Sequence, residues 1–130
     1  MDAFQELDSL IQPALDRRLP GILALNDDLA RHPELSGQEY ESSARIVQLL
    51  RLQGLEVEYP FGGEPTGFRT TIRGGRGEGA RLALLAEYDA LPGIGHGCGH
   101  CASGSISVLS ALALNDLRHH FAGQVDLIGT

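Results

Sequence analysis

Residues 81–101 read RLALLAEYDALPGIGHGCGHC, and the arrangement of the rest of the chain follows from this stretch. The nearly continuous apolar run from Leu82 to Glu87 is typical of a strand in a central position, covered on both faces. A Pro/Gly loop and a cluster of cysteine and histidine residues follow, and then an apolar segment with helical periodicity. This order is typical of α/β proteins, which place functional residues just beyond the carboxyl ends of strands.

The segments on either side supply the other elements. A recurrence of apolar residues at about every 3.6 positions predicts helices over residues 3–31, 38–53 and 101–120. Shorter apolar runs predict further strands at residues 55–61, 68–72 and 124–128. Pro20 leaves open one kinked helix or two in the first segment, and Ser36 with Glu39 has the spacing of a capping box before the second.

These elements predict an α/β fold, with helices covering a mixed, largely parallel central sheet. The last helix would be the crossover between the strand at 82–87 and the strand at 124–128. The length of 130 residues suits one domain, and a hydrophobic content of 42% suits a packed core. The chain ends as its last strand would turn into a loop, which predicts that it is the N-terminal part of a longer protein.

The charge and cysteine content exclude several classes of function. A net charge of −7 without a basic cluster argues against a nucleic-acid partner and against an anionic membrane surface. The sequence contains no signal peptide and no apolar run long enough to span a membrane. The two cysteines are only three positions apart and do not form the disulfide framework of a secreted domain. We therefore expect a cytoplasmic protein.

Cys98 and His100 are candidate metal ligands. They are one residue apart among glycines, and thiolate and imidazole suit a borderline cation such as Zn²⁺. The alternative is a buried cysteine and a structural histidine in an ordinary loop. Glu87 and Asp89 occupy alternate positions, so both point to one side of the strand end while Tyr88 points to the other. Carboxylates placed there can ligate a metal or orient a ligating histidine.

Cys98-Gly-His-Cys101 also matches the C-x-x-C motif of thiol–disulfide oxidoreductases, so a redox module remains an alternative function. Two features count against it. No Trp or Pro directly precedes Cys98, and no Pro follows residue 92. The cis-proline that such folds place beside the disulfide is therefore missing.

Three motifs resemble the M20 metallopeptidases: HPELS at residues 32–36, EYDALPG at 87–93 and GHGCGH at 95–100. The similarity runs from about Leu25 to Thr130 and is nearest to the amidohydrolase branch with aminobenzoyl-glutamate utilisation protein B and the mammalian M20-domain dipeptidases. Cys101 stands where that branch usually has Asn or Asp. The resemblance implies a zinc-peptidase-like catalytic domain. Residues 1–130 would be its N-terminal part, without the C-terminal half and the lid or dimerisation domain.

The resemblance also implies a chemistry. Cys98 and His100 match ligands of a site for two divalent metal ions, zinc or manganese, and Asp89 matches the catalytic-site aspartate that orients it. The longer parent would hydrolyse an amide bond in an N-acyl amino acid or dipeptide-like substrate and would form a homodimer. The paired-glutamate motif that carries the general base would follow Thr130. We therefore expect residues 1–130 to be inactive alone.

Overall fold

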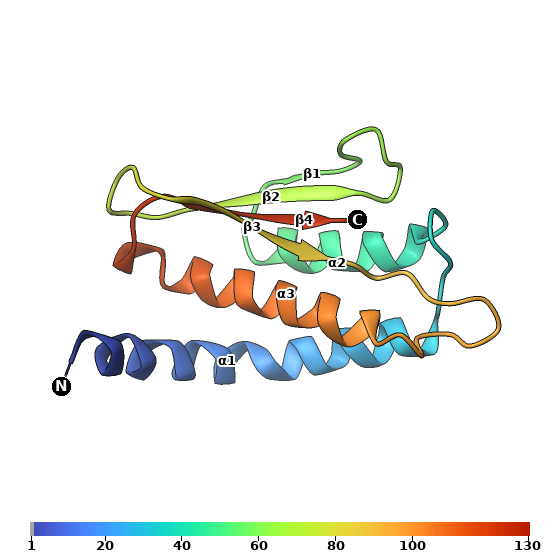
Figure 1. The fold of residues 1–130 in the computed structure, drawn as a ribbon, viewed down its shortest axis with the longest axis horizontal. Coiled ribbons are helices and arrows are strands. Elements are labelled where there is room, and N and C mark those ends of the chain that lie inside the picture. The colour runs from blue at the N-terminus through green and yellow to red at the C-terminus, as the bar shows by residue number, and fades with distance from the viewer. Residues whose placement is uncertain (1) are drawn as a thin grey trace.

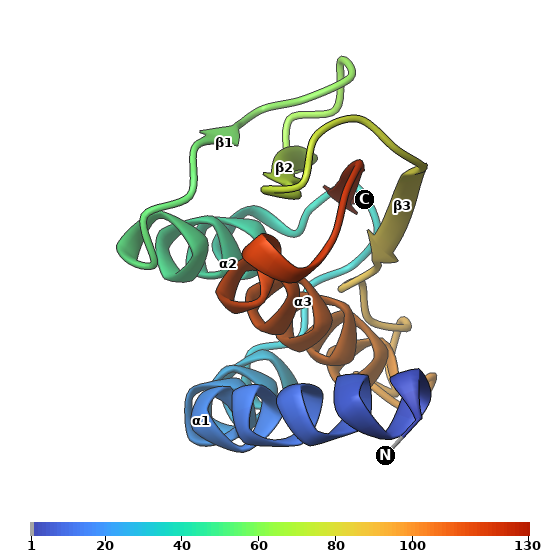
Figure 2. The same cartoon turned by 90° about the vertical axis from the view of Figure 1, so that its left-hand side faces the viewer.

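The computed structural model describes residues 2–130, and these residues form three α-helices and a four-stranded sheet (Figure 1). The helices are α1 (Ala3–Arg31), α2 (Tyr40–Leu52) and α3 (His100–Asp116), and a short 3-10 helix follows at Arg118–His120. The strands are β1 (Val57–Glu58), β2 (Phe68–Arg73), β3 (Arg81–Ala86) and β4 (Gln124–Gly129). Figure 2 shows that the helices lie on one side of the sheet. The predicted α/β fold is confirmed.

The sheet is mixed and has the strand order β1-β2-β4-β3. β2 pairs antiparallel with both β1 and β4. β3 and β4 pair in parallel, from Arg81↔Gln124 to Ala86↔Gly129, so the predicted crossover through α3 is confirmed. The expectation of a largely parallel sheet is not met within residues 2–130, because antiparallel pairing joins the remaining strands.

The predicted central position of the strand at 82–87 is wrong for the part of the chain that the structure describes. β3 is an edge strand that pairs with β4. Its side chains Leu82 and Leu85 are 61% and 58% exposed. An apolar run indicates that a strand is suited to burial, but burial also needs neighbours. Here β4 supplies one side and α3 one face, so the outer edge stays open.

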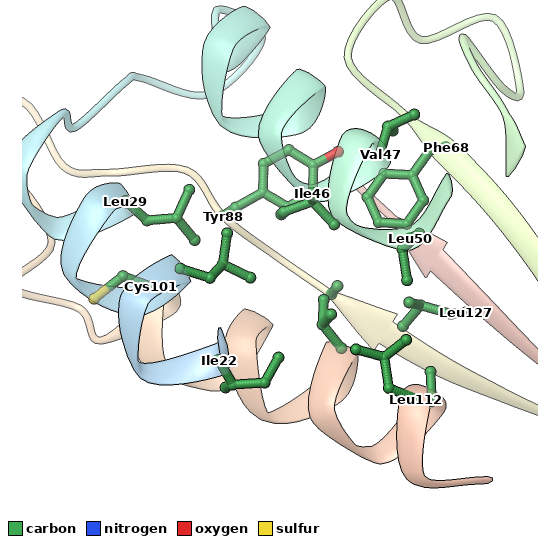
Figure 3. Close-up of a cluster of buried hydrophobic side chains, with 14 of the residues drawn as sticks. Ile22, Leu29, Ile46, Val47, Leu50, Phe68, Tyr88, Cys101, Leu112 and Leu127 are labelled. Atoms are coloured by element: carbon green, nitrogen blue, oxygen red, sulfur yellow. The ribbon is translucent and has the colours of Figure 1, made fainter. Parts of the chain in front are cut away.

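The hydrophobic core lies between the helices and the covered face of the sheet (Figure 3). Alternate residues of β2 and β4 point into it, because side chains alternate along a strand. Its fully buried members include Leu29 of α1, Leu50 of α2 and Leu127 of β4. Burial of each such side chain stabilises the fold by about 1.5–3 kcal/mol.

Residues 3–31 form one continuous helix, although Pro13 and Pro20 lie inside it. Each proline removes a backbone hydrogen bond, but α1 is held along α3 by packing and by a bidentate ion pair. Arg18 Nε and Nη2 donate to the Asp116 carboxylate at 2.9 and 2.6 Å.

Among the described helices, none combines the length and apolar character that spanning a bilayer requires.

α2 is capped differently from the prediction. It begins at Tyr40 rather than Gln38, and Glu39 makes no side-chain capping bond. The cap comes instead from Glu34, whose carboxylate accepts hydrogen bonds from the backbone N–H groups of Glu41 and Ser42 at 3.1 and 2.6 Å. A carboxylate at a helix N-terminus also interacts favourably with the helix dipole.

Candidate active site

The carboxyl ends of β3 and β4 meet the N-terminus of α3 at one cavity. β3 leads into the Glu87–Asp89 segment, β4 ends beside Thr130, and α3 begins at His100. This is the edge at which open α/β sheets place their sites. The cavity has a volume of about 260 Å³ and is lined by Ser36, Glu39, Glu87, Asp89, His100 and Thr130.

The imidazole of His100 lies between two carboxylates. Its Nδ1 is 2.6 Å from Asp89 Oδ1, and its Nε2 is 3.1 Å from Glu87 Oε2. This arrangement confirms that Glu87 and Asp89 point to the same side of the strand end. The Asp89 contact is the shorter of the two, and together the two contacts fix the orientation of the ring.

Tyr88 points the opposite way, as predicted, and anchors the strand end in the core. Its side chain is fully buried, its ring stacks on Phe68 with centroids 6.0 Å apart, and its hydroxyl donates to the carbonyl of Thr66. Burial raises the pKa of Tyr88 far above its usual range, and the nearby charge of Glu39 raises it further. The phenol therefore stays protonated and remains a donor.

Two close backbone approaches position the loop between β3 and α3. Ala90 N donates to the Glu34 carbonyl at 2.7 Å, which joins the loop to the segment before α2. Gly104 in α3 packs against Glu87 so closely that an added Cβ would lie 2.4 Å from the Glu87 carbonyl oxygen. Gly99, the N-cap of α3, has a φ of 83°, a conformation that glycine adopts without strain.

The two cysteines differ in environment, and neither is in a disulfide. Cys98 is exposed, with its Sγ 3.8 Å from the Asp89 backbone carbonyl oxygen. Cys101 is buried and belongs to the hydrophobic core together with Leu29 (Figure 3). Cys98 therefore contacts the backbone of Asp89 but does not line the cavity, whereas Cys101 lies in the core.

The donor atoms fit one side of a metal site. In the tautomer with the proton on Nδ1, bonded to Asp89, Nε2 is the nitrogen that could hold an ion, which is the usual carboxylate–histidine arrangement at metal centres. Glu87 Oε2 lies beside that nitrogen. Glu87 and Asp89 contact opposite ring nitrogens, however, and within residues 2–130 no three His, Cys, Asp or Glu side chains converge on one point. Catalytic zinc usually takes three protein ligands, so the described residues do not form such a site by themselves.

Two further residues, to which the sequence pattern assigned no role in chemistry, lie near the site. Glu39, interpreted from the sequence as part of a capping box, is 3% exposed and lines the cavity. His96 has both ring nitrogens buried without a hydrogen-bond partner among the described residues. Burial lowers the pKa of His96, although the Asp89 charge and the nearby Leu29 carbonyl oppose the shift. The sequence pattern does not distinguish Glu39 from an ordinary helix-capping residue, or His96 from an ordinary loop histidine.

No family model matches the chain, but individual relatives do. It is 31% identical to the probable hydrolase sll0100 of Synechocystis sp. over 92% of this chain and 33% of that protein. It is 29% identical to N-acetyl-L-cysteine deacetylase of Bacillus subtilis over 88% of this chain and 29% of that enzyme. The chain thus spans about a third of the length of the curated relatives it matches.

Solved structures agree with the sequence relatives. The crystal structure of YXEP from Bacillus subtilis, a dinuclear metal binding peptidase from the M20 family, superposes with a TM-score of 0.77 at 29% identity. The match covers 91% of this chain and 35% of YXEP. Sequence relatives and the fold point to the same family, and the chain belongs to the M20 peptidases and amidohydrolases.

Proposed function

We propose that this chain is the N-terminal part of a metallohydrolase catalytic domain, and that the complete protein hydrolyses an amide bond in an N-acyl amino acid or dipeptide-like substrate. The observation that carries the proposal is the His100 imidazole held by Asp89 at the carboxyl end of β3. Membership of the M20 family supports the reaction class, and the name N-acetyl-L-cysteine deacetylase of a relative supports the kind of substrate.

In this proposal Asp89 is the catalytic-site aspartate, and Cys98 and His100 hold metal. Asp89 would keep the proton of His100 on Nδ1, which would leave the lone pair of Nε2, on the side of Glu87, for an ion. Glu87 adds negative charge beside that nitrogen, which favours a bound cation. Two divalent ions, zinc or manganese, would polarise the scissile carbonyl and lower the pKa of a bound water when present.

The proposal makes this chain inactive alone. The chain spans about a third of the length of its relatives. In a complete protein of that length, the remaining part would contain further strands, the general-base glutamate, the remaining ligands and a lid or dimerisation domain. The open edge of β3, with Leu82 and Leu85 exposed, suits an additional strand. We also propose that the complete protein is cytoplasmic and that it forms a homodimer.

The thiol–disulfide alternative has one observation in its favour. Cys98 is exposed and Cys101 is buried at the start of α3, and a C-x-x-C motif at a helix N-terminus is an arrangement that redox enzymes use. Against it, Cys101 lies in the hydrophobic core, where attack on a mixed disulfide would need local opening.

Metal analysis of four proteins separates the two functions. We expect the unmodified chain to retain Zn²⁺ or Mn²⁺ weakly after dialysis, Cys98→Ser and His100→Ala to lose it, and Cys101→Ser to keep it. Reduction of a disulfide substrate by the metal-free chain, abolished by either cysteine substitution, would instead establish the redox alternative. Metal retention by Cys98→Ser equal to that of the unmodified chain would contradict the ligand assignment.

Activity needs a complete domain. A chimera in which this chain replaces the segment that it matches in N-acetyl-L-cysteine deacetylase should hydrolyse N-acyl amino acids, and Asp89→Asn should abolish that activity. The 130-residue chain alone should show no hydrolysis with either metal. Metal-dependent hydrolysis by the chain alone would disprove the proposed incompleteness, and an inactive but folded chimera would count against the proposed function.

A further inference from the structure

A chain of two hydrogen bonds joins three distant segments behind the site. Thr66 Oγ1 donates to Glu39 Oε2 at 2.8 Å, and the Tyr88 hydroxyl donates to the Thr66 carbonyl. Glu39 precedes α2, Thr66 precedes β2 and Tyr88 follows β3. All three are buried, at 3%, 4% and 0% exposure. The strand end that carries the site is thus attached to the start of α2.

Tyr88 is the point at which this attachment reaches the site. It lies between Glu87 and Asp89, which contact the two ring nitrogens of His100. Neighbouring side chains of an extended segment point to opposite faces. A rotation of the backbone at Tyr88 that moves its ring therefore also moves the carboxylates of Glu87 and Asp89. Stacking on Phe68 restrains the plane of the Tyr88 ring, and the hydroxyl bond to Thr66 restrains its far end.

Glu39 belongs to the network and to the cavity at once. It lines the same cavity as Glu87, Asp89 and His100, but the hydrogen bond that the structure gives its carboxylate comes from Thr66, behind the cavity. A buried carboxylate is costly unless hydrogen bonds compensate it. A neutral glutamine could accept the same bond from Thr66, so the hydrogen bond and the charge can be tested separately.

We infer that Glu39 is a positioning residue of this site, which acts through Thr66 and Tyr88 to hold the Glu87–Asp89 strand end in register with His100. The inference rests on the proposed function only in naming the site. The geometry it concerns, the hydrogen bond between His100 Nδ1 and Asp89, exists in the metal-free chain and can be measured there. No metal and no substrate are needed for the test.

The tautomer of His100 provides the readout. We would measure the ring nitrogen chemical shifts of His100 by NMR in the metal-free 130-residue chain, assigned with His100→Gln, at a pH where the imidazole is neutral. In the unmodified chain we expect the Nδ1–H form to dominate. Loss of a hydrogen bond to a charged acceptor should lower the ratio of Nδ1–H to Nε2–H forms by about tenfold or more.

Three substitutions should lower that ratio without changing the overall fold: Glu39→Ala, Thr66→Val and Tyr88→Phe. Glu39→Gln should keep it, because the amide oxygen still accepts from Thr66. Glu41→Ala is the matched control, because the Glu41 side chain is 72% exposed on α2. Circular dichroism and thermal unfolding would verify that each variant is folded. If Glu39→Ala does not fold, the nearly isosteric Thr66→Val and Tyr88→Phe decide the question.

Two outcomes would overturn the inference. One is an unchanged tautomer ratio in folded Glu39→Ala, Thr66→Val or Tyr88→Phe. The other is an equal change in Glu39→Gln and Glu39→Ala, which would assign the effect to the charge rather than to the hydrogen bond. Neither outcome affects the metal analysis of Cys98 and His100. Conversely, an inactive chimera would leave this result intact, so the inference and the proposed function can fail separately.

Discussion

Gly104 of α3 lies directly against the backbone of Glu87, with room for no side chain between them. An added Cβ would lie 2.4 Å from the Glu87 carbonyl oxygen. Backbone atoms on both sides prevent relief by a change of rotamer. This approach brings the first turn of α3, and with it His100, to the carboxylates at the end of β3.

Replacement of Gly104 by alanine should therefore destabilise the protein. We expect the free energy of unfolding to fall by about 1–3 kcal/mol, the usual cost of overpacking a tight contact. Gly21→Ala is the control, because nothing lies within 4 Å of a Cβ at that helical position. It should stabilise α1 by up to about 1 kcal/mol. Urea unfolding followed by circular dichroism would measure both, and equal effects would refute the packing argument.

The ion pair between Arg18 and Asp116 should make stability depend on pH. The hydrogen bond from Arg18 lowers the pKa of Asp116, although burial opposes the shift. Because the folded-state pKa of Asp116 lies below the unfolded-state pKa, the stabilisation is fully present above the unfolded-state pKa and is lost as the pH falls through the folded-state pKa.

Asp116→Asn should accordingly lower the free energy of unfolding at pH 7 by about 1.5–3 kcal/mol. The difference from the unmodified chain should shrink in acid, below the unfolded-state pKa of Asp116. Asp8→Asn, at an exposed position of α1, should have little effect at any pH. Urea unfolding at several pH values would measure the difference. A difference that stays constant down to pH 3 would assign the effect of Asp116→Asn to packing instead.

The open edge of β3 should cause self-association. An exposed apolar edge strand is a template for pairing with other chains, and a charged side chain on the edge suppresses such pairing. We expect the apparent mass in light scattering to rise with concentration for the unmodified chain and to rise less for Leu85→Lys. Leu23→Lys is matched, since Leu23 is 55% exposed on α1. An equal effect of both substitutions would indicate general hydrophobicity rather than the edge.

Much of the fold could be predicted because its signals are local. The periodicity of residues 3–31 identified α1, and the parallel pairing of β3 with β4 followed from the crossover rule. The edge position of β3 could not be predicted, because the residues of a strand indicate whether it is suited to burial but not how many neighbouring strands it has. The cap of α2 by Glu34 was missed for a similar reason. It depends on a carboxylate eight residues before Ser42, outside the usual capping spacing.

The site could be predicted in part for the same reason. The alternation of Glu87, Tyr88 and Asp89 correctly placed both carboxylates on one side, because strand geometry sets that direction. Whether Cys98 and His100 bind metal stays a prediction. The place of Glu39 at the cavity could not be predicted, because its carboxylate is held by Thr66, which is 27 residues away in the sequence.

Glu34 holds two elements at once. Its carboxylate caps α2, and its carbonyl accepts the hydrogen bond from Ala90, the residue after Asp89. The segment from Glu34 to Tyr40 is therefore a spacer of fixed length between a helix and the end of a strand. A single-residue insertion or deletion there would shift α2 against the site, so the length of this short turn should stay constant during evolution.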